Sequence, residues 1–251
     1  MEGTEMPVDD VAMVFPLTKD CHHYTRRQDV DWDIQKYWAQ RYSIFSLYDE
    51  GIHMTDNSWF GVTPEPVANK VAGDLRAFTA PSKSILIDMF AGAGGNVIAF
   101  ALSKQWSTII AIEKDSSVIA CAQHNAAIYG VVDQITWIND DCFSYLSKLS
   151  SIDPMKTVVF ASPPWGGPGY TSDEIFNLHT MAPYSIKQIH GACRGMDSAL
   201  YLPRTSDLRQ IAKLVPEGKK VEVVQYCMEG ASKALVAYIP ALYEAGMEDL
   251  L

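Results

Sequence analysis

The residues best suited to chemistry lie in SPPWGGPGY, residues 162–170, which directly follows the apolar run KTVVFA, residues 156–161. Proline fixes the backbone angle φ at about −65° and donates no hydrogen bond, so this turn is stiff and leaves its carbonyl groups available to a ligand. Trp165 adds a broad aromatic face. The pattern predicts a pocket wall for a planar amine, formed by Ser162, Pro163 and Trp165. The alternative is a proline turn beside a core tryptophan.

A second candidate site is the segment ILIDMFAGAGGNVIAFAL, residues 85–102, which predicts a strand, a glycine turn and a helix. Gly92 and Gly94 would let backbone amides at the start of a helix approach a small ligand. A nicotinamide dinucleotide site would need a third glycine, in the spacing G-x-G-x-x-G, and Val97 stands at that position. The spacing therefore disfavours the dinucleotide interpretation.

Acidic residues follow each of the first three expected strands. Asp88 closes the first strand, and Glu113 ends the apolar run of residues 108–113. Glu113 lies about 20 residues beyond the glycines, where a carboxylate usually binds a ribose diol. Asp141 follows the third strand, residues 134–139, and could accept a hydrogen bond from an adenine amino group. A strand-end cap at Asp88 and a solvated charge at Glu113 remain the plain alternatives.

Together, these acids, the glycine turn and SPPW resemble the S-adenosylmethionine methyltransferases of the Rossmann-like class. Further segments are similar to those of the trimethylguanosine synthase family, over roughly residues 30 to 240: KYWAQRYSIFSLYDEGI, WFGVTPE, DMFAGAGGN, NAAIYG, SPPWGGPGY and YLPR. The resemblance implies methyl transfer from S-adenosylmethionine to the exocyclic 2-amino group of a 7-methylguanosine RNA cap, without a metal. The products would be S-adenosylhomocysteine and the di- and trimethylguanosine caps of small nuclear and nucleolar RNAs.

The resemblance also implies roles for individual residues. Catalytic roles fall on the pocket wall: Ser162, Pro163 and Trp165. Cofactor contacts fall on eight residues: Thr63, Asp88, Gly92, Gly94, Asn96, Glu113, Asp141 and Ser162. Cap contacts fall on five: Lys36, Phe45, Trp165, Tyr201 and Arg204. In this scheme Ser162 and the Pro163 carbonyl accept hydrogen bonds from the guanine amine, and Trp165 stacks on the positively charged base.

The fold class expected from this resemblance is α/β: a class I methyltransferase with a seven-stranded, mostly parallel sheet, assigned to residues 81–251. The sequence places its strands at residues 85–88, 108–113, 134–139, 156–161 and 198–203, followed by an antiparallel hairpin of residues 221–228 and 234–240. Helices are expected at residues 116–130, 185–193 and 206–214, the first of them ended by Gly130.

An aromatic-rich helical extension, residues 26–80, is expected to contribute to both the cap and the cofactor sites. Apolar residues recur at helical spacing from Ile34 to Tyr48, which predicts one amphipathic helix with most rings in the core. The next helix is expected to begin with Thr63 as its N-cap and Pro64 at its first position.

Residues 1–25 show no periodicity and are predicted to form a flexible tail. The alternative for this segment is a metal cluster of Cys21, His22 and His23.

Composition limits the partners. A net charge of −10 argues against a protein that tracks along a nucleic-acid backbone, but not against one that binds a cap end only. RNA choice is therefore expected to lie in another protein or in a missing region, and the resemblance implies small nuclear or nucleolar ribonucleoproteins as the protein partners. The five cysteines form no metal or disulfide pattern, and no apolar run reaches the ~20 residues of a membrane span.

The resemblance implies a nuclear or nucleolar location, with the cytoplasm as a further possibility. Two other functions remain open: methylation of adenine in RNA or of a protein glutamine, and cap binding without catalysis.

Overall fold

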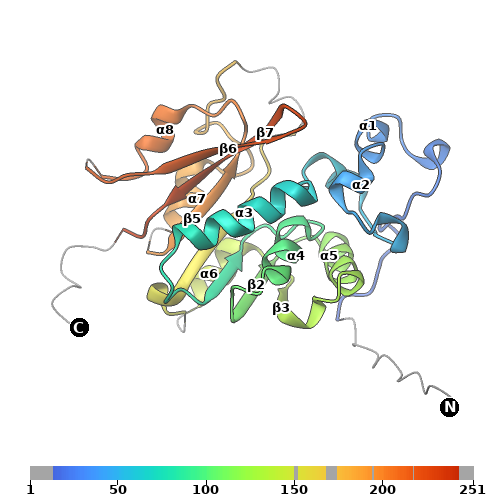
Figure 1. Ribbon diagram of the computed structural model, residues 1–251, viewed down its shortest axis with the longest axis horizontal. Coiled ribbons are helices and arrows are strands. Elements are labelled where there is room, and N and C mark those ends of the chain that lie inside the picture. The colour runs from blue at the N-terminus through green and yellow to red at the C-terminus, as the bar shows by residue number, and fades with distance from the viewer. Residues whose placement is uncertain (1–13, 150–151, 168–173, 194, 217, 243–251) are drawn as a thin grey trace, which may run out of the picture.

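The computed structural model describes residues 14–149, 152–167, 174–193, 195–216 and 218–242. Within these residues a seven-stranded sheet forms the centre of the molecule, in the order β3-β2-β1-β4-β5-β7-β6 (Figure 1). Its strands are β1 (Ile85–Asp88), β2 (Thr108–Ile112), β3 (Ile135–Ile138), β4 (Thr157–Ala161), β5 (Asp197–Leu202), β6 (Glu222–Met228) and β7 (Ala231–Ile239). Strands β1 to β5 pair in parallel, and β7 runs antiparallel to both β5 and β6. The predicted fold class is confirmed.

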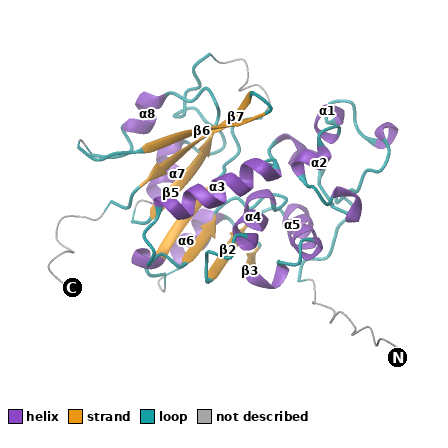
Figure 2. Ribbon diagram, in the orientation of Figure 1, coloured by secondary structure: helices purple, strands orange, loops and turns teal. Residues whose placement is uncertain are grey.

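Helices cover both faces of the sheet (Figure 2). The first face packs against α3 (Glu65–Phe78), α4 (Gly95–Leu102) and α5 (Ser116–Ile128), and the second against α6 (Cys142–Lys148), α7 (Ile186–Cys193) and α8 (Leu208–Ala212). Neighbouring strand residues alternate between these two layers. Leu86 belongs to the first apolar cluster and Ile87 to the second, and Val158 and Val159 divide in the same way. Because both faces are buried, the strands are continuous apolar runs, which is why the sequence reveals them.

The predicted strands are found within three residues of their expected limits. The second strand ends at Ile112, so that Glu113 lies in the loop beyond it, and β7 begins at Ala231. Helix α5 carries the expected stop, since Gly130 follows it with a φ of +68°.

The single amphipathic helix predicted from Ile34 to Tyr48 is wrong. The segment forms two short helices, α1 (Gln35–Trp38) and α2 (Arg41–Ile44), and Gln40 between them leaves the helical conformation. The Arg41 guanidinium lies 3.9 Å from the Trp38 ring centroid and donates to the Trp38 carbonyl at 3.3 Å. The helical spacing therefore indicated burial of most of these residues but not one continuous helix. Of the residues it marked, four are buried (Ile34, Trp38, Phe45 and Tyr48), Tyr37 is half-buried, and Tyr42 is exposed.

Residues 14–25, which were predicted as part of a flexible tail, pack against the rest of the chain. The Phe15 N–H donates to Gln123 on α5 at 2.9 Å, and the Thr18 and Ser117 hydroxyls lie 2.7 Å apart. His22 pairs with Met54 through two backbone hydrogen bonds of 2.8 and 2.9 Å. The prediction is wrong for this part of the tail, and residues 1–13 lie outside the described residues.

The described residues contain neither a clustered metal site nor a membrane-spanning helix. Over the described ranges, no group of three or more His, Cys, Asp or Glu side chains is arranged to hold a metal ion, so Cys21, His22 and His23 do not form the alternative cluster. In the same part of the chain, none of the helices combines the length and apolarity needed to cross a bilayer.

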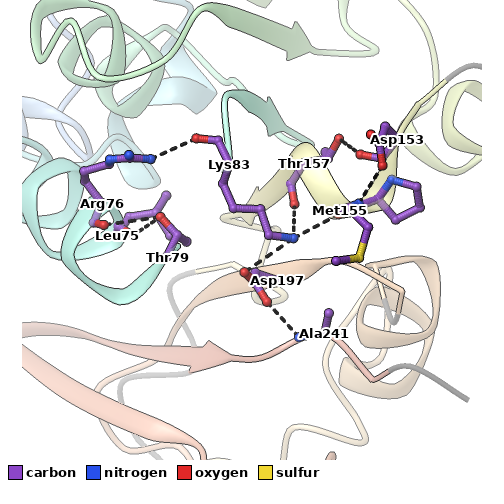
Figure 3. A network of polar contacts seen from close by, with 10 residues as sticks. Leu75, Arg76, Thr79, Lys83, Asp153, Met155, Thr157, Asp197 and Ala241 are labelled. Atoms are coloured by element: carbon purple, nitrogen blue, oxygen red, sulfur yellow. Dashed lines mark hydrogen bonds and ion pairs between the residues drawn. The ribbon is translucent and has the colours of Figure 1, made fainter. Parts of the chain in front are cut away.

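A buried lysine ties the strands together at the edge where they begin (Figure 3). Lys83 is 4% exposed, and its ammonium donates to the carbonyls of Pro154 at 2.9 Å and Thr157 at 3.2 Å. The Asp197 carboxylate lies 3.5 Å from the same ammonium and accepts from the Ala241 N–H at 2.9 Å. One cation thus joins the starts of β1, β4 and β5 to the end of β7.

Replacing this lysine should destabilise the fold. In Lys83→Met the Asp197 carboxylate and two carbonyls lose their partner in a largely buried site, so the free energy of unfolding should fall by about 3 kcal/mol. Urea unfolding followed by circular dichroism measures the change. The matched control is Lys156→Met, because Lys156 is exposed and lies 3.8 Å from an exposed Asp153. Equal effects of the two substitutions would contradict the structural role of Lys83.

Candidate functional site

A cavity of about 840 Å³ lies at the edge where β1, β2 and β4 end. Its floor is formed by the glycine turn after β1, by Glu113 after β2, by Asp141 after β3 and by the segment after β4. The extension closes the other side with residues from two stretches, 33–37 and 57–63. The carboxyl ends of parallel strands and the extension therefore enclose one space between them. This is where ligands bind in open α/β sheets.

The glycine turn is shaped for close approach. Gly92 and Gly94 have φ angles of +54° and +102°, which residues with a side chain rarely adopt. At Gly95, the first residue of α4, a Cβ atom would lie 3.0 Å from the Thr63 carbonyl. The turn and the extension thus pack so closely that a side chain at Gly95 would push on the Thr63 backbone, and Gly95 was not among the predicted residues.

Glu113 holds the glycine turn through backbone hydrogen bonds. Its carboxylate accepts from the Gly92 N–H at 3.1 Å and from the Asp115 N–H at 3.0 Å. Burial raises the pKa of this carboxyl, and the two backbone donors oppose that shift. Glu113 lines the cavity, so its carboxylate can also accept from a ligand's hydroxyl groups.

Thr63 and Asn96 join the extension to α4. Thr63 is not the N-cap that was predicted, because α3 begins at Glu65 and Pro64 occupies the cap position. Its hydroxyl instead accepts from the Asn96 side-chain amide at 2.9 Å. The Asn96 Oδ1 is buried and has no hydrogen-bond partner among the described residues, and Asn96 lines the cavity. An acceptor in that position fits the α-ammonium group of the expected cofactor.

Asp88 lies behind the turn rather than in the cavity wall. It is fully buried, and its Oδ1 accepts from the Phe90 N–H at 3.2 Å, whereas its Oδ2 finds no hydrogen-bond partner within the part of the chain that the structure describes. Burial raises the pKa of Asp88 to about 7; the Phe90 N–H opposes this shift and the nearby Glu113 charge adds to it.

The segment after β4 brings its three predicted residues into the cavity wall: Ser162, Pro163 and Trp165. The Trp165 ring lies nearly parallel to the Tyr201 ring, with 13° between their planes and 6.0 Å between their centroids. The Trp165 indole N–H donates to the Tyr201 carbonyl at 3.3 Å. Tyr201 is 4% exposed and does not line the cavity, so it supports the indole from behind.

The structure brings most of the predicted site residues together. The cavity is lined by Lys36, Thr63, Gly92, Asn96, Glu113, Asp141, Ser162, Pro163 and Trp165. The residues that do not line it are Phe45, Asp88, Gly94, Tyr201 and Arg204. Phe45 is 2% exposed and packs near Tyr129; it follows α2 with an extended backbone. Arg204 is exposed beyond the end of β5.

Several lining residues were not predicted. Tyr37 and Phe60 supply the extension's rings to the cavity and meet edge to face, with centroids 5.3 Å apart. Phe90, Lys114 and Tyr184 line the side near Asp141. Tyr37 belonged to the periodic pattern, but that pattern could not distinguish a core ring from a cavity ring. Tyr184 lies in a loop without local periodicity.

A buried amide holds the extension against this site. Asn125 of α5 is fully buried and accepts from the His53 N–H at 2.9 Å. Its amide nitrogen donates to the carbonyls of His53 at 2.9 Å and Ala93 at 3.0 Å. One side chain therefore connects the extension, the glycine turn and α5.

Known proteins match both the sequence and the fold. A family model described as RNA cap guanine-N2 methyltransferase matches residues 83–242. The trimethylguanosine synthase of Schizosaccharomyces pombe is 35% identical over 208 residues, which cover 82% of this chain and 85% of that protein. The trimethylguanosine synthase of Saccharomyces cerevisiae is 34% identical over 183 residues, which cover 71% of this chain but only 57% of that protein.

A solved structure agrees with the architecture. The O-methyltransferase TomG from Streptomyces achromogenes, in complex with S-adenosylmethionine, superimposes with a TM-score of 0.50 at 13% identity, over 84% of this chain and 90% of that one. At this identity the likeness shows the fold alone.

The raised pKa of Asp88 predicts a pH-dependent stability. The unfolded carboxyl titrates near 3.8 and the folded one near 7, so between these values the folded state binds the extra proton and loses stability as pH rises. At about 1.4 kcal/mol per pKa unit, the loss is on the order of 4 kcal/mol and is complete above pH 7. Asp88→Asn should therefore match the wild type near pH 4 and be the more stable protein at pH 8.

Urea unfolding of both proteins from pH 4 to 8 measures this difference, with the exposed Asp133→Asn as control. A stability difference between Asp88→Asn and the wild type that stays constant across the range would show that Asp88 is ionised throughout.

Proposed function

The chain belongs to the RNA cap guanine-N2 methyltransferase family, and we propose that its cavity holds S-adenosylmethionine on the glycine turn and the capped guanine against Trp165. Membership of this family indicates the reaction, which is methyl transfer from S-adenosylmethionine to the 2-amino group of a cap guanine. The observation that supports the arrangement is that one cavity is lined by both the glycine turn and the indole.

The cofactor end is assigned to the turn and the acids around it. Glu113 accepts from the ribose hydroxyls, Asp141 from the adenine amino group, and Asn96 from the α-ammonium group. Thr63 orients Asn96 through their 2.9 Å hydrogen bond. Gly92 and Gly94 allow the cofactor to approach the backbone closely, and Ser162 borders its methionine portion. Asp88 does not touch the cofactor but holds the turn by accepting a hydrogen bond from the Phe90 N–H.

The cap end is assigned to the aromatic wall. A 7-methylated guanine carries a positive charge, and a cation over an indole face gains about 0.5 to 2 kcal/mol beyond stacking. Tyr201 holds the Trp165 ring from behind, which reduces the freedom lost on stacking. Tyr37 and Phe60 line the same cavity and replace Phe45 as the extension's aromatic contribution.

Two cations are assigned to the phosphates. Lys36 lines the cavity and is exposed, so it can contact the triphosphate of the cap. Arg204 lies outside the cavity, so it can contact only the RNA chain that follows the cap.

The chemistry needs orientation more than acid–base catalysis. S-adenosylmethionine supplies an electrophilic methyl group when bound. The 2-amino lone pair of guanine is delocalised into the ring, so Ser162 and the Pro163 carbonyl act by accepting from the amine and aiming that lone pair. Holding reactants in line can lower a barrier by roughly 7 to 11 kcal/mol. No metal has a role in this scheme.

The RNA substrates are assigned as small nuclear and nucleolar RNAs, and the location as the nucleus, including the nucleolus, with the cytoplasm as a further site. The support is the relatives' name, trimethylguanosine synthase. With a net charge of −10 the chain is a poor general RNA binder, so ribonucleoprotein partners are expected to deliver the capped RNA.

The test is methyl transfer to four acceptors, read by product mass: 7-methylguanosine triphosphate, GTP, an adenine oligonucleotide and a glutamine peptide. The proposal predicts products one and two methyl groups heavier with 7-methylguanosine triphosphate only. Preferential transfer to the oligonucleotide or the peptide would replace it by the other amine or amide specificities. Cofactor binding without transfer to any acceptor would indicate cap binding without catalysis.

The stacking role of Trp165 has its own test. Trp165→Ala should weaken binding of 7-methylguanosine triphosphate by about 10- to 100-fold, because stacking and the cation–π contact are both lost. Calorimetry should find the affinity for S-adenosylhomocysteine changed by less than about twofold, because the cofactor is assigned to the glycine turn and its acids rather than to the indole.

Trp137→Ala is the matched control, because its half-buried indole N–H also donates to a backbone carbonyl, that of Val132 at 3.2 Å, away from the cavity. Equal losses of cofactor and cap affinity in Trp165→Ala would count against the stacking role.

A further inference from the structure

Tyr184 lines the cofactor end of the cavity between Asp141 and Lys114. We propose that Tyr184 is a positioning residue that orients the Asp141 carboxylate toward the cofactor's adenine amino group and so sets the specificity for adenine. This inference rests on the proposed function, because it takes the Asp141 side of the cavity as the adenine site.

The backbone around Tyr184 is anchored at several points. The Phe176 N–H donates to the Thr205 carbonyl at 2.8 Å, and the Phe176 carbonyl accepts from the Asp207 N–H at 3.1 Å. Farther along, the Ile186 N–H donates to the Leu178 carbonyl at 3.1 Å, and both side chains are fully buried. Tyr184 therefore extends from a loop that is bonded to the start of α8 at one end and closed at the start of α7 at the other.

The hydrogen bonds of Tyr184 have a defined direction. Its hydroxyl lies 3.3 Å from the Asp141 Oδ2 and 3.5 Å from the Lys114 ammonium nitrogen. An ammonium group has no acceptor and an ionised carboxylate has no donor. The hydroxyl therefore accepts from Lys114 and donates to Asp141. Lys114 also lies 5.6 Å from the centroid of the Tyr184 ring, which keeps the cation on this side of the cavity.

The second oxygen of Asp141 is already in use. Asp141 is the N-cap of α6, and its Oδ1 accepts from the Ser144 N–H at 3.0 Å. With Oδ1 held by the helix and Oδ2 held by Tyr184, the carboxylate cannot rotate without losing one of the two bonds. Each carboxylate oxygen can accept more than one hydrogen bond, so the remaining capacity can serve a ligand amine.

The ring of Tyr184 is held separately from its hydroxyl. Its centroid lies 4.9 Å from that of Phe143 and 5.8 Å from that of Phe90. These distances are typical of stabilising aromatic pairs. Replacement of tyrosine by phenylalanine should therefore preserve the packing and remove only the bond to Asp141.

The experiment compares two unreactive ligands by calorimetry: S-adenosylhomocysteine and S-inosylhomocysteine, in which a carbonyl oxygen replaces the amino group. The wild type should bind the adenosyl ligand at least about 10-fold more tightly, because the inosyl oxygen cannot donate to Asp141. Tyr184→Phe should reduce this ratio to about threefold by weakening the adenosyl ligand alone. Asp141→Asn should abolish the preference, and adding Tyr184→Phe to it should change nothing further.

The control is Tyr145→Phe on α6, outside the cavity lining, which should keep the wild-type ratio. The proposal is overturned if the wild type shows no preference, if Tyr184→Phe keeps the wild-type ratio or weakens both ligands equally, or if the Tyr184 and Asp141 effects add. Thermal melting should find Tyr184→Phe folded, because its ring packing is preserved, and a wild type without the preference overturns the proposal even without a variant. These binding experiments contain no cap, so a failure of this inference can be told apart from a failure of the proposed function, which the methyl-transfer experiment tests.

Discussion

Asn125 makes the contact on which the site depends. The backbone N–H and carbonyl of half-buried His53, in the extension, both pair with the Asn125 amide. The same amide also donates to Ala93 inside the glycine turn, so it sets the position of the turn relative to the extension. A buried amide with three hydrogen bonds tolerates little displacement, because each lost partner costs about 1 to 3 kcal/mol. The width of the cavity follows from this junction.

The residues that line the cavity form two groups of different chemistry. The sheet side presents carboxylates and glycine backbone at the strand ends, which suit a ligand rich in hydroxyl and amino groups. The rings come from both sides: Trp165, held flat by Tyr201, follows β4, and Tyr37 and Phe60 belong to the extension. Because the carboxylates and the rings line one cavity, a methyl donor and a flat amine can be placed next to each other. The buried pair of Lys83 and Asp197 lies at the opposite edge, where it stabilises the sheet without entering the site.

How much of this was predictable depended on the range of the interactions involved. Strands such as β4 were evident because all five residues are buried, and acids such as Glu113 were evident because they end apolar runs. Helical spacing in the extension identified most of the buried residues, but it also marked the exposed Tyr42. It missed the break at Gln40, which accompanies the stacking of Arg41 on Trp38. It could not show that Phe45 faces the core while Tyr37 faces the cavity. Tyr184 was missed because its position is set by contacts with residues distant in the sequence, such as Asp141 and Lys114.

The most direct measurement of the central claim is the affinity of Asn125→Ala for both ligands. If the junction at Asn125 holds the two sides of the cavity together, calorimetry should find binding of S-adenosylhomocysteine and of 7-methylguanosine triphosphate each weakened by about 10-fold or more. Gln123→Ala is the comparison, since Gln123 is also a buried amide of α5, but its side chain bonds to Phe15 rather than to the extension or the glycine turn. Wild-type affinity for both ligands in a folded Asn125→Ala protein would contradict the account.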